Sequence, residues 1–311
     1  MHSVKENISL LTTQKTRLHI ITELVNNGIN KAIDKLENRL EALWVKTPIV
    51  SLDPIKAKIG KKEGSKHEKR YLVWKYIEND GTIKPKKQGI VRAKKVVDNR
   101  KDELGKTQSS SFYQVGGKKL YPGMVLQERK DCGLGFSGGY SFTKGALFRF
   151  DLNLGQRLNI PVKQLKLYGE MIIADKDIAA KKLIGSMPET KINYTFGKFS
   201  FGVLKEFPIV RNYHLGGFIG WTRQHITWGQ SNYSLNGEQI IASGINWGIK
   251  AGTNLFIDKI QFIATFNNHN YIKTGYKEYD NTETTPLDYT LSDIFPDMNS
   301  FSIDLSIRIT L

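Results

Sequence analysis

Apolar and polar residues alternate in short segments over the second half of the chain, and most regularly at its end. In the last eleven residues every odd position is apolar: Phe301, Ile303, Leu305, Ile307, Ile309 and Leu311. The even positions include Asp304 and Arg308, and charges are rare on the buried face of a soluble strand. Residues 146–154 repeat the pattern, with Phe148 and Leu152 on the apolar face. This alternation predicts strands with one face toward lipid and the other toward a polar lumen.

Eight segments of this kind follow one another between Cys132 and Leu311. The apolar faces of the other six are Leu134, Phe136, Tyr140 and Phe142; Leu165, Leu167, Met171 and Ile173; Phe199, Phe201 and Val203; Tyr213, Leu215, Ile219 and Trp221; Ile245, Trp247, Ile249 and Ala251; Ile260, Phe262, Ala264 and Phe266. Tyr194 and Phe196 have the opposite parity to Phe199, which predicts a β-bulge near Gly197. The even number of strands predicts a closed antiparallel transmembrane β-barrel over residues 131–311.

The connections between these segments alternate in length. Short turns are expected at 159–162, at 206–210 and around Asp258, and external loops at 143–145, 175–190, 224–240 and 269–299. Outer-membrane barrels have short periplasmic turns and longer external loops. This phase predicts an outer-membrane location, with the N-terminal region and Leu311 in the periplasm.

The stretch from Cys132 onward resembles the small eight-stranded outer-membrane barrels of the OmpA and OmpX type. Its closing run, FSIDLSIRITL, resembles the C-terminal signal that the barrel assembly machinery reads in Gram-negative bacteria. The resemblance implies two partners, outer-membrane lipid and that machinery, with the six odd-numbered apolar positions from Phe301 to Leu311 as the assembly signal. The abundance of Lys, Asn, Tyr and Ile is similar to that of Bacteroidota proteins.

The first 130 residues divide into three parts. Residues 1–47 carry apolar positions at helical spacing and predict an amphipathic helical segment, which either packs on its own domain or forms a short coiled coil. Residues 48–69 are rich in Lys and Gly and predict a basic linker. In residues 70–130, Tyr71 to Ile77 alternates, Asp80-Gly81 is a hairpin signal and Gly89 to Val97 follows as a partner strand. These features predict a small periplasmic β module.

Charge separates the same two regions. The chain has 46 Lys and Arg against 30 Asp and Glu, a net charge of +16, and residues 1–130 hold all but +2 of it. Basic runs at 56–69, 84–87 and 92–95 are either solvated surface or a site for nucleic acid, anionic lipid, a periplasmic protein or an anionic envelope polymer. Aromatic residues are not interleaved with these runs in sequence, which disfavours nucleic acid. The first 30 residues lack a signal-peptide core, so an exported chain would be a mature or shortened form.

Polar residues on the inward faces predict a structural network of charges in the lumen. Its members are Arg149, Asp151, Arg157, Lys166, Glu170, Lys250, Asp304 and Arg308. An eight-stranded barrel is filled by its side chains, so these charges must pair with one another. No histidine spacing predicts a metal site, and we expect no cofactor and no catalytic residue.

These observations favour a non-enzymatic outer-membrane barrel with a basic periplasmic extension, acting as an anchor or a component of an envelope complex. One alternative is a barrel enzyme acting on lipid or peptide at the outer rim, with His225 and His269 at the start of external loops. Another is a soluble all-β structural protein of a phage or secretion particle. The soluble alternative predicts that Phe148, Leu152, Ile303 and Ile307 pack inside.

Overall fold

The structure, a computed structural model, describes Val25 and residues 45–311, with gaps at 80, 103–107, 130, 143–144, 186, 188–191, 229–237, 256–259, 279–282 and 297–300. The chain divides into two units, Met1–Val45 and Lys46–Leu311. The helical segment predicted for residues 1–47 therefore lies almost wholly outside the described residues and stays a prediction. In the described part of the chain, no helix has the length and apolar character needed to cross a membrane.

Residues 46–128 form a closed six-stranded barrel, here called the small barrel. Its strands are β1 (Lys46–Leu52), β2 (Ile55–Ala57), β3 (Arg70–Asn79), β4 (Thr82–Lys95), β5 (Ser110–Gly117) and β6 (Val125–Glu128). They pair in the order β1-β2-β5-β4-β3-β6, and β6 returns to β1. The predicted hairpin of β3 and β4 is confirmed. The prediction of a linker at residues 48–69 is wrong. This range contains most of β1 and all of β2, and Ile49, Ala57 and Ile59 are buried in the core of the small barrel.

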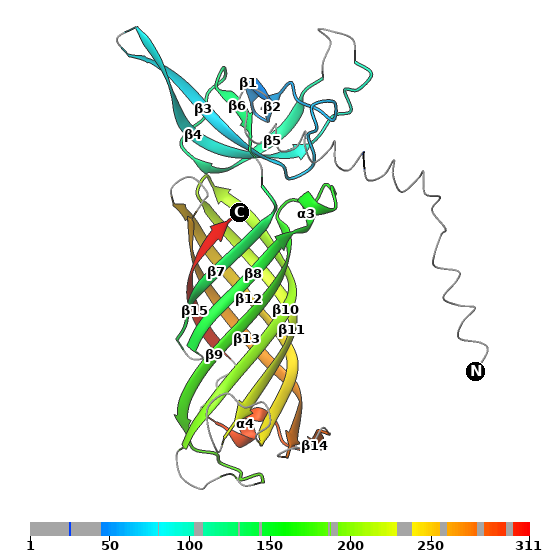
Figure 1. Cartoon of the computed structure of the whole chain (residues 1–311), viewed down its shortest axis with the longest axis vertical. Coiled ribbons are helices and arrows are strands. Elements are labelled where there is room, and N and C mark those ends of the chain that lie inside the picture. Colours follow the sequence, from blue (N-terminus) through cyan, green and yellow to red (C-terminus); the bar gives the residue numbers. More distant parts are fainter. Residues whose placement is uncertain are drawn as a thin grey trace, which may run out of the picture. The chain divides into compact units, whose positions relative to one another are not determined.

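Residues 134–310 form the predicted eight-stranded antiparallel barrel, here called the large barrel (Figure 1). Its strands are β7 (Leu134–Ser141), β8 (Gly145–Asn153), β9 (Leu165–Ile178), β10 (Ile192–Val210), β11 (Tyr213–Thr227), β12 (Gln239–Leu255), β13 (Ile260–Lys277) and β15 (Phe301–Thr310). Each strand pairs with its neighbour in the chain, and β15 closes the ring against β7. A short strand, β14 (Thr285–Leu287), adds to the end of β13.

The large barrel has apolar side chains outside and polar side chains inside. Phe148 and Ile303 are each 53 % exposed, and Ile307 is 47 % exposed. Leu152 lies on the same outward face of β8. The soluble alternative, which expected these four side chains inside, is contradicted, because the inward positions of the same strands are occupied by buried charges such as Arg149 and Asp151.

The two ends of the large barrel differ. At the proximal end β7 begins and β15 ends. Toward the opposite, distal end, β9 to β13 continue, with lengths of 14 to 19 residues against 8 to 10 for β7, β8 and β15. The connections at the distal end, which the sequence predicted as long external loops, are therefore shorter than predicted. The turn predicted at 206–210 is also wrong, because β10 runs on to Val210 and the chain reverses at Arg211 and Asn212.

The bulge predicted near Gly197 is absent from the described strands. β10 pairs through Gly197 with both β9 and β11 without a shift in register. Tyr194 and Phe196 instead face inward, where they are 0 % and 5 % exposed. Their parity differs from that of Phe199 because the distal part of the barrel has an apolar interior.

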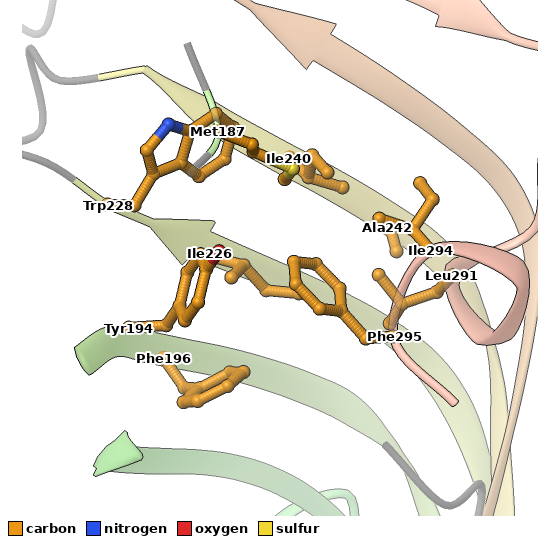
Figure 2. Close-up of a cluster of buried hydrophobic side chains, with 10 residues drawn as sticks. All are labelled: Met187, Tyr194, Phe196, Ile226, Trp228, Ile240, Ala242, Leu291, Ile294 and Phe295. Carbon is orange, nitrogen blue, oxygen red and sulfur yellow. The ribbon is translucent and has the colours of Figure 1, made fainter. Parts of the chain in front are cut away.

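An apolar cluster fills the distal end of the large barrel. The short helix α4 (Leu291–Ile294) and Phe295 lie inside the extended strands, as Figure 2 shows. Around them pack Met187, Tyr194, Phe196, Ile226, Trp228, Ile240 and Ala242. The ring of Phe295 meets that of Tyr194 edge to face, with centroids 5.3 Å apart. The distal cluster therefore closes this end of the barrel with packed side chains.

Two inward glycines on β12 make room for large side chains in the proximal half of the lumen. A Cβ at Gly248 would lie 2.1 Å from the carbonyl oxygen of Phe266 and 2.5 Å from the ring of Phe218. A Cβ at Gly252 would lie 2.3 Å from Nε2 of His214. Glycine is needed here because a neighbouring strand and a lumen side chain approach closely.

Candidate functional site

The proximal half of the lumen holds a chain of ion pairs centred on Glu206 and Asp151. Both carboxylates come from inward positions of strands, and each contacts two cations. Lys166 and Lys250 place Nζ 2.5 Å from the two carboxylate oxygens of Glu206. Arg308 donates from Nε to Oδ2 of Asp151 at 2.7 Å and also bonds its other oxygen, and Lys166 lies 3.7 Å from the same carboxylate. All five side chains are at most 5 % exposed, so three cations share two carboxylates inside the barrel.

A second group of charges surrounds Glu170 farther along the lumen. Arg149 donates from Nε to Glu170 at 3.0 Å, and Lys198 places its Nζ 2.9 Å from the other oxygen. The same Nζ lies 3.2 Å from Nε2 of His269. The guanidinium of Arg149 also lies 5.4 Å from the ring centroid of Phe218, within the range of a cation–π contact.

Two predicted members of the network differ from the rest. Arg157 lies in the short proximal helix α3 (Leu154–Arg157) and is exposed, so its predicted place in the lumen is wrong. It follows the end of β8, where the strand alternation no longer sets its direction. Asp304 is fully buried, and it accepts a hydrogen bond from Asn267. Among the described residues, no Lys, Arg or His lies within ion-pair distance of Asp304.

Sequence reasoning missed Lys198, Glu206 and His269. Lys198 and Ser200 occupy inward positions of β10, whereas Phe199 between them faces outward. The alternation along this strand could therefore have identified Lys198 as a lumen residue. Glu206 was assigned to a turn and His269 to a loop, because the lengths of β10 and β13 were underestimated.

Glu68 connects the small barrel with the proximal end of the large barrel. It is 1 % exposed and adopts a φ of 63°, a conformation that is uncommon outside glycine. Its carboxylate accepts bonds from the Tyr113 hydroxyl at 2.7 Å, from the backbone N–H of Gln164 at 3.1 Å and from Asn153 at 3.5 Å. Burial and the charge of Glu68 raise the pKa of Tyr113 well above its ordinary value, so this hydroxyl keeps the proton that it donates.

Asp131, in the segment between the two barrels, is held by two arginines of the small barrel. Arg92 places Nη2 2.8 Å and Arg70 places Nε 3.4 Å from Oδ2 of Asp131, whose side chain is fully buried. Burial alone would raise the pKa of this carboxyl, but the charges of Arg92 and Arg70 outweigh it and lower the pKa below its ordinary value. Asp131 also accepts a bond from the N–H of Gly133 at 2.8 Å, just before β7 begins.

Backbone and amide groups complete the junction. Asn212 accepts a bond from the N–H of Gly117 at 2.6 Å, and Asn254 donates to the carbonyl of Val115 at 2.7 Å. Asn159 accepts a bond from the N–H of His67 at 2.9 Å. A cavity of about 30 Å³ between these contacts and the charges of the lumen is lined by residues of both barrels, and it has room for only about two water molecules.

Acid is expected to loosen this junction. The pKa of Asp131 is lower in the folded protein than in the unfolded chain, where it is about 3.9. The stability that this carboxylate contributes is therefore fully present above about pH 3.9 and is lost as the pH falls through the folded-state pKa. Hydrogen exchange of segment 110–117, corrected for the intrinsic rate, should therefore accelerate below about pH 4. Asp131→Asn should produce the same loosening at neutral pH, at a cost of about 1–3 kcal/mol. Identical pH profiles for the parent and Asp131→Asn would contradict the role of this carboxylate.

The hairpin of β3 and β4 extends beyond the small barrel as an arm, defined here as residues 75–87 (Figure 1). Aromatic residues that are separate from the basic runs in the sequence lie opposite basic-run residues in this hairpin. Pairing of the strands sets Trp74 opposite Lys87 and Tyr76 opposite Pro85. The Nζ of Lys87 lies 5.7 Å from the ring centroid of Trp74. The sequence separates these residues, and the hairpin brings them together.

The histidines of the rim-enzyme alternative lie in strands and not in loops. His269 is 1 % exposed inside β13, and Nδ1 of His225 on β11 is 2.9 Å from Oε1 of Gln239. Among the described residues, no three His, Cys, Asp or Glu side chains are grouped so as to hold a metal ion.

The sequence matches no protein-family model and no curated protein. Among solved structures, the chain is similar to a major outer membrane protein from Thermus thermophilus, at 12 % sequence identity and a TM-score of 0.36. The alignment covers 57 % of this chain and 98 % of the Thermus chain.

Proposed function

We propose that this chain is a non-enzymatic outer-membrane protein whose large barrel anchors the small barrel at the periplasmic face, as part of a cell-envelope complex. From the sequence pattern, we also propose that the large barrel is of the OmpA and OmpX type and that the protein comes from the Bacteroidota. In this arrangement the barrel assembly machinery inserts the large barrel, and residues 1–130 face a periplasmic protein or envelope polymer.

One observation carries the proposal: the large barrel is apolar outside and charged inside, opposite to a soluble protein. Phe201 is 61 % and Ile249 is 63 % exposed, whereas Lys198 and Lys250 are at most 2 % exposed. An outward apolar belt around a polar interior is the arrangement that a bilayer stabilises. A soluble protein rarely exposes an apolar surface of this extent.

An anchoring role is supported by the junction. The small barrel contacts the proximal end through buried hydrogen bonds to Glu68, in addition to the connecting segment. A buried ion pair between Arg92 and Asp131 holds that segment against the small barrel. Buried charge-assisted bonds of this kind favour one fixed arrangement of two parts. The lumen charges are paired with one another, and those that reach a cavity, Lys166, Glu206 and Arg308, border one of only about 30 Å³, which favours a structural role over catalysis.

The proposal is tested by separating membranes of cells that express the chain and by protease protection. The large barrel should sediment with outer membranes, and the small barrel should be digested only after the outer membrane is permeabilised. Digestion of the small barrel in intact cells would reverse the proposed orientation. Recovery of the chain in the aqueous fraction would remove the membrane assignment.

The purified protein should not form a pore. The lumen is filled by ion-paired side chains, the distal end by the distal cluster and the proximal end by the junction. Planar bilayers containing the protein are expected to show no unitary conductance beyond that of protein-free bilayers. A porin of known conductance, reconstituted in the same way, is the positive control. Regular open steps would contradict the closed lumen.

A further inference from the structure

The arm of the small barrel has one strand edge that is open to pairing. β3 pairs with β6 only over Tyr71–Trp74. From Lys75 to Asn79 it pairs with β4 on one side, and no described strand covers its other edge. These five residues continue directly from the β6 pairing, so an added strand would extend the line of β6.

The two edges of the arm differ in how they resist an added strand. The β4 side carries Lys84, Pro85, Lys86 and Lys87 in sequence. Proline lacks an N–H, and lysine and proline are the residues that protect sheet edges in natural proteins. The β3 side, KYIEN, contains no proline and includes Tyr76 and Ile77, which favour strands. The β3 edge is therefore the accessible one.

The side chains of the arm indicate the chemistry of a partner. Lys75 is paired with Lys86 and Ile77 with Lys84, so three lysines lie on one face. Lys75, Lys84 and Lys86 are exposed, and none has an acidic partner within 4 Å among the described residues. The opposite face carries Tyr76 and Ile83, which are 48 % and 65 % exposed, together with Glu78 and Lys87.

From this geometry we propose that the β3 edge of the arm, at Lys75–Asn79, binds an extended protein segment that alternates acidic and apolar residues. The segment adds as a strand next to β3, with its acidic side chains on the face that carries the three lysines and its apolar side chains on the face that carries Tyr76 and Ile83. Main-chain hydrogen bonds supply affinity in such strand addition, and alternate side chains supply specificity. A second copy of the chain is disfavoured as the occupant, because residues 46–129 carry 21 Lys and Arg against 9 Asp and Glu.

This inference rests on the proposed function for the identity of a periplasmic partner, but the binding itself is tested in solution. The probe is a fluorescein-labelled peptide of eight alternating glutamate and valine residues, titrated with full-length protein in detergent and followed by anisotropy. Three comparison probes are the lysine–valine peptide, the glutamate–valine peptide with alternate backbone nitrogens methylated, and dextran sulfate.

We expect saturable binding of the unmethylated glutamate–valine peptide and no binding of the lysine–valine peptide or dextran sulfate. Backbone methylation should weaken it by at least about tenfold, the loss expected from one or two hydrogen bonds. The triple variant Lys75→Gln, Lys84→Gln and Lys86→Gln should weaken it by a similar factor. The matched control Lys56→Gln, Lys58→Gln and Lys118→Gln removes the same charge from exposed positions outside the arm and should bind like the parent.

Equal affinity for the methylated peptide would overturn strand addition and leave only a basic surface. Binding of dextran sulfate that requires the arm lysines, without peptide binding, would replace the protein segment with an anionic polysaccharide. Absence of saturable binding to the parent would also overturn the inference. Failure of the proposed function would appear instead in the membrane fractionation, which does not depend on any of these titrations.

Discussion

Asp151→Asn is expected to lower the free energy of unfolding of the large barrel by about 3–5 kcal/mol, the usual cost of removing one partner from a buried ion pair. Asp151 accepts two bonds from the Arg308 guanidinium, which also donates from Nη1 to Gln261 at 2.8 Å, and lies 3.7 Å from Lys166. The amide keeps the volume of the side chain but removes the negative charge that compensates these two buried cations. Urea titration of the refolded protein in detergent, followed by tryptophan fluorescence, measures the loss.

Asp304→Asn is the matched control for this prediction. It is the same chemical change on the inward face of another strand of the barrel, at a residue equally buried. Because Asp304 has no cation within ion-pair distance among the described residues and accepts a bond from Asn267, the expected loss is at most about 1 kcal/mol. Equal losses for the two variants would contradict the view that ion pairing, and not polarity alone, stabilises the lumen.

Phe295→Ala is expected to destabilise the distal end by a comparable amount, about 3–5 kcal/mol. Phe295 is fully buried among the side chains of the distal cluster, and truncation leaves a cavity that the surrounding strands cannot fill. Because the cluster closes the barrel at this end, the variant should also expose segment 283–296 to protease before the barrel itself unfolds. Limited proteolysis with mass spectrometry, together with urea titration, measures both effects.

Tyr289→Ala tests whether this loss depends on burial. Tyr289 lies in the same distal segment but is 43 % exposed, and its main contact is with Lys182, whose Nζ is 3.6 Å from the ring centroid. The expected loss is at most about 1 kcal/mol. If Tyr289→Ala opened the segment as readily as Phe295→Ala, the distal cluster would not be what closes the barrel.

The strands of the large barrel could be predicted because the alternation of apolar and polar residues within each strand shows which of its faces is outward. In β15, every outward position from Phe301 to Ile309 is apolar, and the structure confirms both its direction and its limits. The prediction was wrong where the environment changes along one strand. Tyr194 and Phe196 are apolar and inward because the distal part of β10 lines the distal cluster, and a rule based on one lipid-facing side cannot represent that change.

The junction could not be predicted, because its contacts join residues that are distant in sequence. Glu68 and Gln164 are 96 residues apart, and Gly117 and Asn212 are 95 residues apart. In the sequences of β1 and β2, the order of apolar and polar residues does not distinguish these short strands from a basic loop. Ile49 and Ala57 become recognisable as core residues only when β6 and β5 pair beside them.

The central claim is that the large barrel is a closed barrel whose apolar exterior requires lipid or detergent. Electrophoresis of the purified, detergent-folded protein with and without boiling tests it directly, since a ring with all its strand hydrogen bonds satisfied internally resists detergent until it is heated. The account predicts a compact band without boiling that shifts to the position of the unfolded chain on heating. A protein that stays soluble without detergent and migrates identically before and after boiling would contradict it.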